Sequence, residues 1–190
     1  MTGAVLAGGK SRRMGFNKAL IKINSETIIE RSLTLFKGVF DDTFIVANDL
    51  LEYESLNTLA VSDIFKGAGS LGGIYTALFH STTDHTFVAA CDMPYMNKQV
   101  IKRILDSYRE AEAIVPFINE RFHPLHAVYH RRCMKPIEAM IKDGNLRIND
   151  LLSKIHVKKL VEADFHGLPI GLSIENINTK EELEKLKLSL

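Results

Sequence analysis

The sequence predicts an α/β domain in three layers, in which a doubly wound, mostly parallel sheet is covered by helices on both faces. Two observations carry this prediction: short apolar runs recur along the chain, and segments with the spacing of amphipathic helices separate them. Strands of a parallel sheet are buried on both faces, so they read as continuous apolar runs rather than as an alternation of apolar and polar residues.

The predicted strands are short runs that are mainly apolar, as is typical of buried strands. In chain order they are Val5–Ala7, Phe44–Ala47, Leu59–Val61, Phe87–Cys91, Ala113–Pro116, Leu125–Tyr129 and Ser173–Ile177. The predicted helices carry apolar residues at helical spacing. In chain order they are Thr27–Phe36, Leu71–His80, Gln99–Tyr108, Lys135–Ile141, Ile148–Leu152 and Lys180–Lys187.

Glycine and polar residues follow several of these strands directly. Gly8 and Gly9 follow the first, and Asn48, Asp63 and Asp92 each come at or soon after the end of a later one. Ligands of open α/β sheets bind at the carboxyl ends of the strands. We therefore expect these residues to converge on one crevice.

The composition fits one domain spanning residues 1–190, with no repeat, low-complexity tract or linker. Residues 117–130 differ in character, because Phe, His and Pro replace the Val and Ile rhythm there, and they are predicted to form a second binding lobe. Charge is nearly balanced, with 24 Lys and Arg against 23 Asp and Glu, which gives no support for nucleic-acid binding.

The cysteines and the amino-terminal residues bear on the cellular compartment. Cys91 and Cys133 are far apart and lack metal-binding spacing, which indicates buried, reduced thiols. The apolar stretch before the first glycines is too short for a signal peptide or a membrane span. We expect a cytoplasmic protein without membrane contact.

The stretch from Leu6 to Lys18 has the composition of an anion site. An apolar run leads into Gly8 and Gly9, and cations follow at Lys10, Arg12, Arg13 and Lys18. Glycines let backbone N–H groups approach an anion closely, and the cations neutralise its remaining charge. This combination predicts a cradle for nucleotide phosphates.

Two familiar motifs match the letters of the sequence but not their expected context. The phosphate-loop pattern from Ala4 to Ser11 would need a strand before it, yet its own interior is strand-like. The dinucleotide pattern Gly67-x-Gly69-x-x-Gly72 begins too far from the preceding strand, because residues 63–66 intervene. A mobile loop over a substrate, with Ser70 capping the following helix, fits better.

The combined motifs resemble those of the molybdenum cofactor guanylyltransferases, the molybdopterin-guanine dinucleotide biosynthesis protein A family of the nucleotidyltransferase superfamily. The resemblance covers essentially the whole chain. Its landmarks are Leu6-Ala7-Gly8-Gly9-x-Ser11-x-Arg13-Met14-Gly15, Lys18-Ala19-Leu20, Asp63, Gly69-Ser70-Leu71-Gly72-Gly73, Cys91-Asp92-Met93-Pro94-Tyr95 and Asn176-Ile177-Asn178-Thr179 with Glu181-Glu182-Leu183. The chain departs from the family at Asn17, where an Asp is usual.

This resemblance implies a Rossmann-like nucleotidyltransferase fold and the transfer of GMP from GTP to molybdopterin, with release of pyrophosphate. Arg13 and Lys18 would neutralise the triphosphate, and Asp92 would hold Mg²⁺. The attacking phosphate is already largely ionised near neutral pH, so no general base is required. Residues 1–95 would bind the nucleotide and residues 96–190 the acceptor. Transient contact with proteins that deliver or receive the cofactor is a further expectation.

The resemblance also assigns contacts with the nucleotide. The backbone of Leu6, Ala7 and Gly8, together with Gly9, would face it, and Asn48 and Asp63 would contact the guanosine portion. A carboxylate can accept hydrogen bonds from the guanine edge, but the sequence leaves open whether Asp63 contacts the base or the ribose.

The carboxyl-terminal asparagines and three histidines permit two readings each. Asn176 and Asn178 share one face of a predicted strand and can bind pterin or phosphate, while Asn178 or Thr179 can equally cap the next helix. His123, His126 and His130 could suggest a metal site, but His123 lies on the opposite strand face, which favours histidines lining the acceptor pocket.

Two other functions remain open at this point. One is a related nucleotidyltransferase that uses CTP or a different phosphate acceptor, although the Gly8-Gly9 pair favours the guanine branch by resemblance. The other is a nucleotide-binding regulatory protein without catalysis, which the presence of Arg13, Lys18 and Asp92 disfavours.

Overall fold

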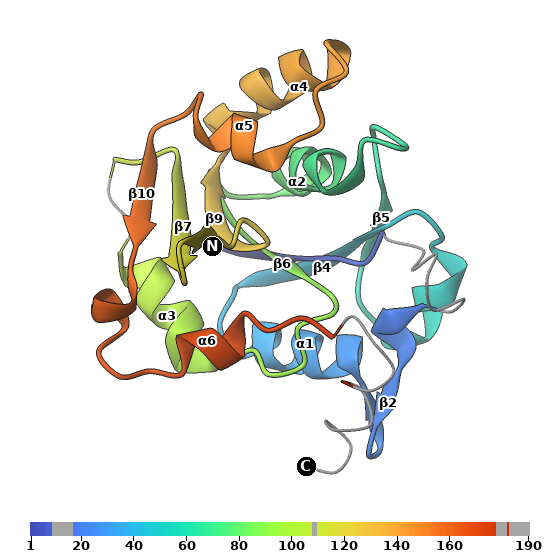
Figure 1. Ribbon diagram of the computed structural model, residues 1–190. Coiled ribbons are helices and arrows are strands. Elements are labelled where there is room, and N and C mark those ends of the chain that lie inside the picture. Colours follow the sequence, from blue (N-terminus) through green and yellow to red (C-terminus); the bar gives the residue numbers. More distant parts are fainter. Residues whose placement is uncertain (9–16, 108–109, 178–181, 183–190) are drawn as a thin grey trace.

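A mixed sheet of eight strands runs through the centre of the computed structural model, which describes residues 1–8, 17–107, 110–177 and 182 (Figure 1). The strand order is β10-β7-β9-β6-β1-β4-β5, with β8 beside β7. The strands are β1 Thr2–Leu6, β4 Asp42–Ala47, β5 Ala60–Ser62, β6 His85–Ala90, β7 Ala113–Ile118, β8 Arg121–Phe122, β9 His126–His130 and β10 Val157–Leu160. A separate hairpin joins β2 Lys22–Ile23 to β3 Glu26–Thr27.

Most of the strand pairs are parallel. β1 pairs in parallel with β4 and β6, β4 with β5, and β7 with β10. Among the described strands of the central sheet, only β9 and β8 run antiparallel to their neighbours, and β9 lies between β6 and β7. The sheet therefore has the mostly parallel character that the apolar runs predicted, and the carboxyl ends of β1, β4, β5 and β6 meet at one edge.

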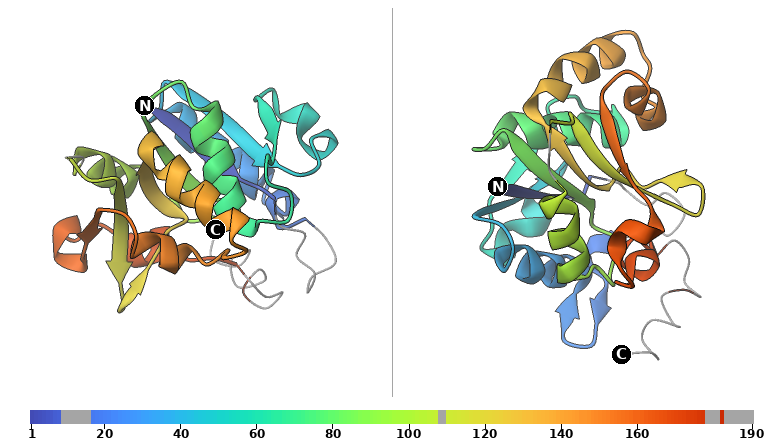
Figure 2. Two further views of the ribbon diagram at one scale, coloured as in Figure 1. Left: turned by 90° about the horizontal axis from the view of Figure 1, so that it is seen from above. Right: turned by 90° about the vertical axis from the view of Figure 1, so that its left-hand side faces the viewer.

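Helices cover both faces of the sheet, as predicted (Figures 1 and 2). One face carries α1 Ile28–Lys37, α3 Lys98–Asp106 and α6 Ile170–Ser173, and the other carries α2 Gly69–His80, α4 Met134–Lys142 and α5 Ile148–Leu152. Each layer has its own apolar core. Short 3₁₀ turns lie at η1 Lys18–Leu20, η2 Leu51–Leu56, η3 Arg131–Cys133 and η4 Glu162–Phe165.

Helix α1 illustrates how local sequence positions an element. The Thr27 hydroxyl accepts a hydrogen bond from the Glu30 backbone N–H, and the Glu30 carboxylate accepts one from the Thr27 N–H at 2.6 Å, forming a capping box. Ile29, Leu33 and Phe36 follow at helical spacing and are buried against the sheet. These contacts hold α1 against the face of the sheet that it covers.

The sequence prediction was wrong at Ser173–Ile177, and it missed the strand β10 and the two-residue strands β2, β3 and β8. Ser173–Ile177 is not a strand, because helix α6 ends at Ser173 and the residues after it form no strand pairs. Ile174 and Ile177 of this segment are instead buried in the core. β10 was not predicted, because Lys158 and Lys159 interrupt its apolar pattern; the Lys159 ammonium lies 4.5 Å from the centre of the Phe117 ring. The predicted helix at Lys180–Lys187 lies outside the described residues, apart from residue 182.

The described helices were compared with the length and hydropathy that a membrane span needs. Within the ranges that the structure describes, none of them is long and apolar enough to cross a bilayer.

We expect His126 to make the fold sensitive to acid. Its ring is fully buried on β9, 3.4 Å from the Ser173 hydroxyl, and burial lowers its pKa from 6.5 to about 3. The folded state therefore resists protonation that the unfolded chain accepts, so this contribution to stability is complete above pH 6.5 and is lost as the pH falls. Between about pH 7.5 and about pH 4.5 the free energy of unfolding should fall by ~3 kcal/mol through this residue.

Urea unfolding at both pH values tests this expectation. His126→Phe should remove that part of the pH dependence, whereas the exposed His156→Gln should leave it unchanged. An equal pH dependence in wild type and His126→Phe would contradict it.

Candidate active site

A cavity of about 750 Å³ opens at the carboxyl ends of β1, β4, β5 and β6. It collects most of the residues that the sequence analysis singled out. Its walls are formed by Leu6, Gly8, Lys18, Val46, Ala47, Asn48, Asp63, Gly67, Gly69, Ser70, Gly73, Ala90, Cys91, Asp92, Leu125 and Asn176. Three predicted residues, Gly9, Arg13 and Asn178, lie outside the described residues.

Lys18 and Asp92 form the charged centre of the cavity. The Lys18 Nζ lies 3.8 Å from Oδ2 of Asp92 and donates a hydrogen bond to the Ile177 carbonyl at 2.8 Å. The Ile177 N–H donates in turn to the Asp92 carbonyl at 2.9 Å. The segment at Ile177 therefore holds both the Lys18 side chain and the main chain of Asp92, although the three residues are far apart in the sequence.

The buried side chain of Asp92 is suited to bind a cation. Burial raises the pKa of its carboxyl above the ordinary value, and the Lys18 ammonium opposes that shift. Its Oδ1 is buried and has no hydrogen-bond partner among the described residues. A buried carboxylate oxygen without a partner is costly, and a bound cation would satisfy it.

Asn176 offers a second buried oxygen in the same cavity. Its Oδ1 also lacks a hydrogen-bond partner among the described residues. Carboxylate and amide oxygens suit Mg²⁺, which commonly takes one or two protein ligands and completes its shell with water and substrate phosphates. No group of three His, Cys, Asp or Glu side chains that could hold a metal occurs in the described ranges, so the fit is to such a sparse site.

The end of β1 is held by side chains from the segment that follows β4. The Asn48 side chain donates to the Gly8 carbonyl at 3.0 Å, and the Tyr53 hydroxyl donates to the Ala7 carbonyl at 3.2 Å. The Ala7 N–H is bound to the Val46 carbonyl. Ala7 therefore does not line the cavity, and its predicted contact with the nucleotide stays a prediction, whereas Leu6 and Gly8 do line it.

Asp63 is tied to helix α2. Its Oδ1 accepts a hydrogen bond from the Thr76 hydroxyl at 2.9 Å, and burial raises the pKa of its carboxyl while that hydrogen bond opposes the shift. The helix approaches so closely that a Cβ at Gly72 would lie 2.9 Å from the Phe65 carbonyl and 3.2 Å from Asp63 Oδ1. Glycine at this position is therefore a packing requirement.

The amino-terminal end of α2 faces the cavity without a side-chain cap. The prediction that Ser70 caps this helix was wrong: the helix begins at Gly69, and its N-cap is Ala68. Gly67 and Gly69 have φ angles of +85° and +60°, which only glycine adopts readily, and the chain turns into the helix there. Residues 63–68 separate β5 from α2. The glycines at 67, 69 and 72 therefore do not follow the strand directly, as those of a dinucleotide-binding motif would.

A second cavity, of about 390 Å³, adjoins the first and shares Leu125 and Asn176 with it. It lies beneath the β7–β8 hairpin and includes Arg121 and His123. Of the three histidines considered, only His123 lines it; His126 is buried in the core, and His130 packs against His85 with ring centres 4.5 Å apart. The histidines are thus dispersed, and only one of them faces a pocket.

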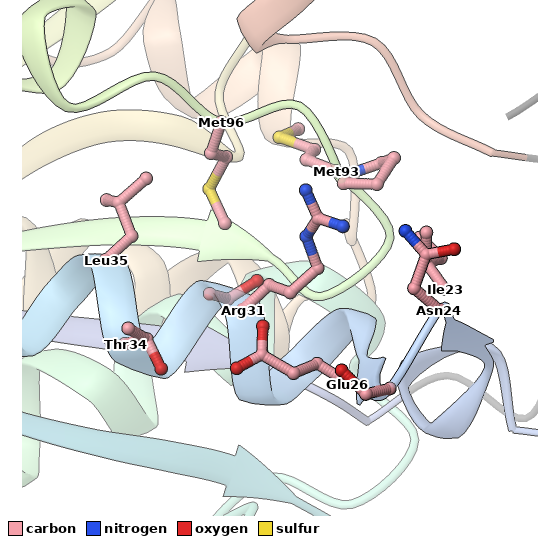
Figure 3. Close-up of a pocket in the computed structure, with 11 residues that line it drawn as sticks. Ile23, Asn24, Glu26, Arg31, Thr34, Leu35, Met93 and Met96 are labelled. Atoms are coloured by element: carbon pink, nitrogen blue, oxygen red, sulfur yellow. The ribbon is translucent and has the colours of Figure 1, made fainter. Parts of the chain in front are cut away.

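A third cavity, of about 420 Å³, lies between α1, the β2–β3 hairpin and the loop after Asp92 (Figure 3). Arg31 points from α1 toward Met93 and Met96, and Glu26 lies beside it (Figure 3). None of the site residues predicted from the sequence lines this cavity. The strand-end cavity therefore remains the candidate active site.

Sequence reasoning missed the residues that act through tertiary contacts. Tyr53, Thr76 and the Ile177 peptide each hold a residue of the site, yet none belongs to a local motif. A buried tyrosine hydroxyl or a main-chain carbonyl leaves no pattern in the sequence, so the structure was needed to find them.

Comparison with known proteins shows which family the chain belongs to. The profile of the MobA-like NTP transferase domain matches residues 3–159, which is most of the chain. The chain belongs to the MobA-like NTP transferase family. Membership in this family confirms the predicted fold class and makes the protein a nucleotidyltransferase.

Relatives and solved structures in the MobA-like family align over nearly the whole chain. The molybdenum cofactor guanylyltransferase of Desulfosudis oleivorans is 38% identical, with 100% of this chain and 96% of the relative aligned. A probable molybdenum cofactor guanylyltransferase of Aquifex aeolicus is 34% identical, covering 96% of this chain and 88% of the relative. The crystal structure of molybdopterin-guanine dinucleotide biosynthesis protein A from Archaeoglobus fulgidus superposes with a TM-score of 0.86 at 28% identity, covering 100% and 98% of the two chains.

Proposed function

We propose that this protein transfers GMP from GTP to molybdopterin, forming the guanine dinucleotide form of the cofactor and releasing pyrophosphate. The names of the relatives support the substrate pair. The observation that carries the proposal is the convergence of Lys18, Asp92 and Asn176 on the strand-end cavity, where Asn176 also lines the adjoining second cavity. A nucleotide and an acceptor in these adjoining spaces would meet beside those three residues.

In the proposed reaction, a phosphate oxygen of the acceptor attacks the α-phosphorus of GTP. A new P–O bond forms as the bond to the β-phosphate breaks, and pyrophosphate leaves with the bonding electrons. The acceptor phosphate is largely a dianion near neutral pH, so the site needs no general base. Catalysis then rests on positioning and on neutralising charge.

The residues of the cavity have separate roles in this scheme. The Lys18 ammonium neutralises negative charge that shifts toward the leaving pyrophosphate, and Arg13, outside the described residues, is proposed to assist it. Asn48 and Asp63, which line the cavity, would contact the guanosine, and the N-terminal end of α2, which has no side-chain cap, offers N–H groups to the same ligand. Asp92, with Asn176, would hold Mg²⁺, which when bound supplies charge for the phosphates.

The two halves of the chain have different proposed roles within one domain. Residues 1–95 supply most of the nucleotide site, and residues 96–190 supply the acceptor cavity, while Asn176 returns to line both. Because the proposed activity needs GTP and a delivered pterin, we expect a cytoplasmic protein that makes transient contacts with proteins handling the cofactor.

Pyrophosphate release with each of GTP, CTP, ATP and UTP, in the presence of Mg²⁺ and molybdopterin, tests the proposal. We expect kcat/KM for GTP to exceed that for the other nucleotides by about a hundredfold, because a site that pairs with the guanine edge leaves polar groups unpaired with another base. Turnover with CTP but not with GTP would instead establish a cytidylyltransferase.

A non-catalytic, nucleotide-binding role is the other outcome of the same assay. It would show as GTP binding without pyrophosphate release from any nucleotide, even with molybdopterin present. The paired Lys18 and Asp92 argue against that outcome, because a binding protein has no need of an unsatisfied carboxylate beside the ammonium.

A further inference from the structure

The side chain of Asn17 makes three hydrogen bonds within the described part of the chain. Its Nδ2 donates to Glu52 Oε2 at 2.7 Å and to the Tyr53 hydroxyl oxygen at 2.7 Å. Its Oδ1 accepts from the Ala19 N–H at 3.0 Å, which caps the 3₁₀ turn that carries Lys18. The partners fix the orientation of the amide, because a carboxylate only accepts and a backbone N–H only donates.

Tyr53 connects Asn17 to the end of β1 through hydrogen bonds. Its hydroxyl oxygen accepts from Asn17, so its single proton is directed to the Ala7 carbonyl, 3.2 Å away. The tyrosine is only 1% exposed, and burial raises its pKa to about 12, so the hydroxyl keeps its proton near neutral pH. A continuous chain of hydrogen bonds thus runs from the turn of Lys18 to Ala7.

We propose that Asn17, Glu52 and Tyr53 form a positioning unit that fixes Lys18 relative to the end of β1. This inference rests on the proposed function, in which Lys18 contacts the triphosphate and Gly8 lies beside it. The unit joins the two stretches, Ala7–Gly8 and Asn17–Lys18, that must both face one nucleotide. None of its three side chains lines the cavity, so they act through Lys18 and the β1 end rather than on the substrate.

The unit also explains why an amide stands at position 17 in this chain. An aspartate there would place a second carboxylate against Glu52, and like charges at hydrogen-bond distance repel. It would also accept the proton of Tyr53, which could then no longer be donated to Ala7. Asn17 and Glu52 are therefore a matched donor and acceptor, and the residue at position 52 determines which residue position 17 tolerates.

This account predicts a graded set of variants for pyrophosphate release from GTP. Asn17→Asp suffers both defects, and its kcat should fall about thirtyfold, with KM for GTP changed less than about twofold. Tyr53→Phe loses the bond to Ala7 and the bond that Asn17 donates, but it brings no like charges together, so its kcat should fall only about fivefold. Asn17→Asp combined with Glu52→Gln removes the repulsion but not the loss at Ala7, and it should recover to the level of Tyr53→Phe.

The controls separate positioning from stability. Glu52→Gln alone still accepts from Asn17 and should stay within about threefold of wild type, and the neighbouring exposed Glu54→Gln should match wild type. Thermal unfolding of every variant is measured beside the kinetics. Changes in melting temperature with kcat left at the wild-type value, or a double variant no better than Asn17→Asp, would overturn the positioning role.

The same variants distinguish failure of this inference from failure of the proposed function. If the wild-type protein turns over another nucleotide and not GTP, the guanylyl proposal fails, and the variants are compared on the nucleotide that reacts. A graded loss with rescue on that nucleotide supports the positioning unit, and a flat series overturns it.

Discussion

Asp92→Asn is expected to lower kcat for pyrophosphate release from GTP by about a thousandfold or more. The substitution keeps the size of the side chain but removes the negative charge that would hold Mg²⁺ and that lies 3.8 Å from the Lys18 ammonium. GTP affinity measured by calorimetry without divalent metal should not be weakened, because without a bound cation the carboxylate makes no favourable contact with the phosphates.

The comparison for this experiment is Asp143→Asn. Asp143 is exposed at the carboxyl-terminal cap of α4 and does not line the cavity, and its replacement should leave both kcat and GTP affinity at wild-type values. Retained turnover in Asp92→Asn would remove Asp92 from the proposed metal role, and a large loss of metal-free GTP binding would instead assign it to direct recognition of the nucleotide.

Lys18→Ala is expected to lower kcat about a hundredfold or more while raising KM for GTP much less. The ammonium is held by the Ile177 carbonyl and lies beside Asp92, so its position is fixed, and in the proposed reaction it faces the leaving pyrophosphate. An interaction that strengthens as the bond breaks stabilises the transition state more than bound GTP, and its loss appears in kcat. Steady-state kinetics with GTP and molybdopterin measure both constants.

Two further variants define the role of Lys18. Lys18→Arg keeps the charge and should recover part of the rate, although the larger guanidinium does not match the position of the ammonium. Lys22→Ala removes an exposed lysine from the nearby hairpin and should have no effect on kcat. A change in KM alone for Lys18→Ala would mean that the side chain only binds the ground state.

The sequence was sufficient for those parts of the site that follow from strand periodicity. Gly8, Asn48, Asp63 and Asp92 could be placed together because the carboxyl ends of parallel strands meet at one edge, and all four line the cavity. Each lies directly after an apolar run or close to its end, so a local pattern was enough to locate it.

The sequence was insufficient where packing decides the local structure. The apolar residues Ile174 and Ile177 suggested a strand, but they pack as part of an irregular segment that passes the cavity. The edge strand β10 was hidden by its lysines, whose aliphatic stems can lie along apolar surface. Asn176 was therefore placed in the site for the wrong structural reason, since it reaches the cavity from a loop and not from a strand.

Glu52 and Tyr53 show a third limit of the sequence. The departure from the family pattern at Asn17 was visible, but its partners are thirty-five and thirty-six residues away and belong to a 3₁₀ turn without a distinctive motif. Only the folded arrangement reveals that an amide at position 17 and a carboxylate at position 52 satisfy each other.

The peptide of Ile177 has a consequence for the order of folding. It binds Lys18 through its carbonyl and Asp92 through its N–H, and the contact with Lys18 spans 159 residues of sequence. Contacts between such distant residues form late, because closing a long loop costs entropy before the contact is made. We therefore expect the segment at Ile177 to dock after the sheet has assembled, so that Lys18 and Asp92 reach their final positions only in that last step.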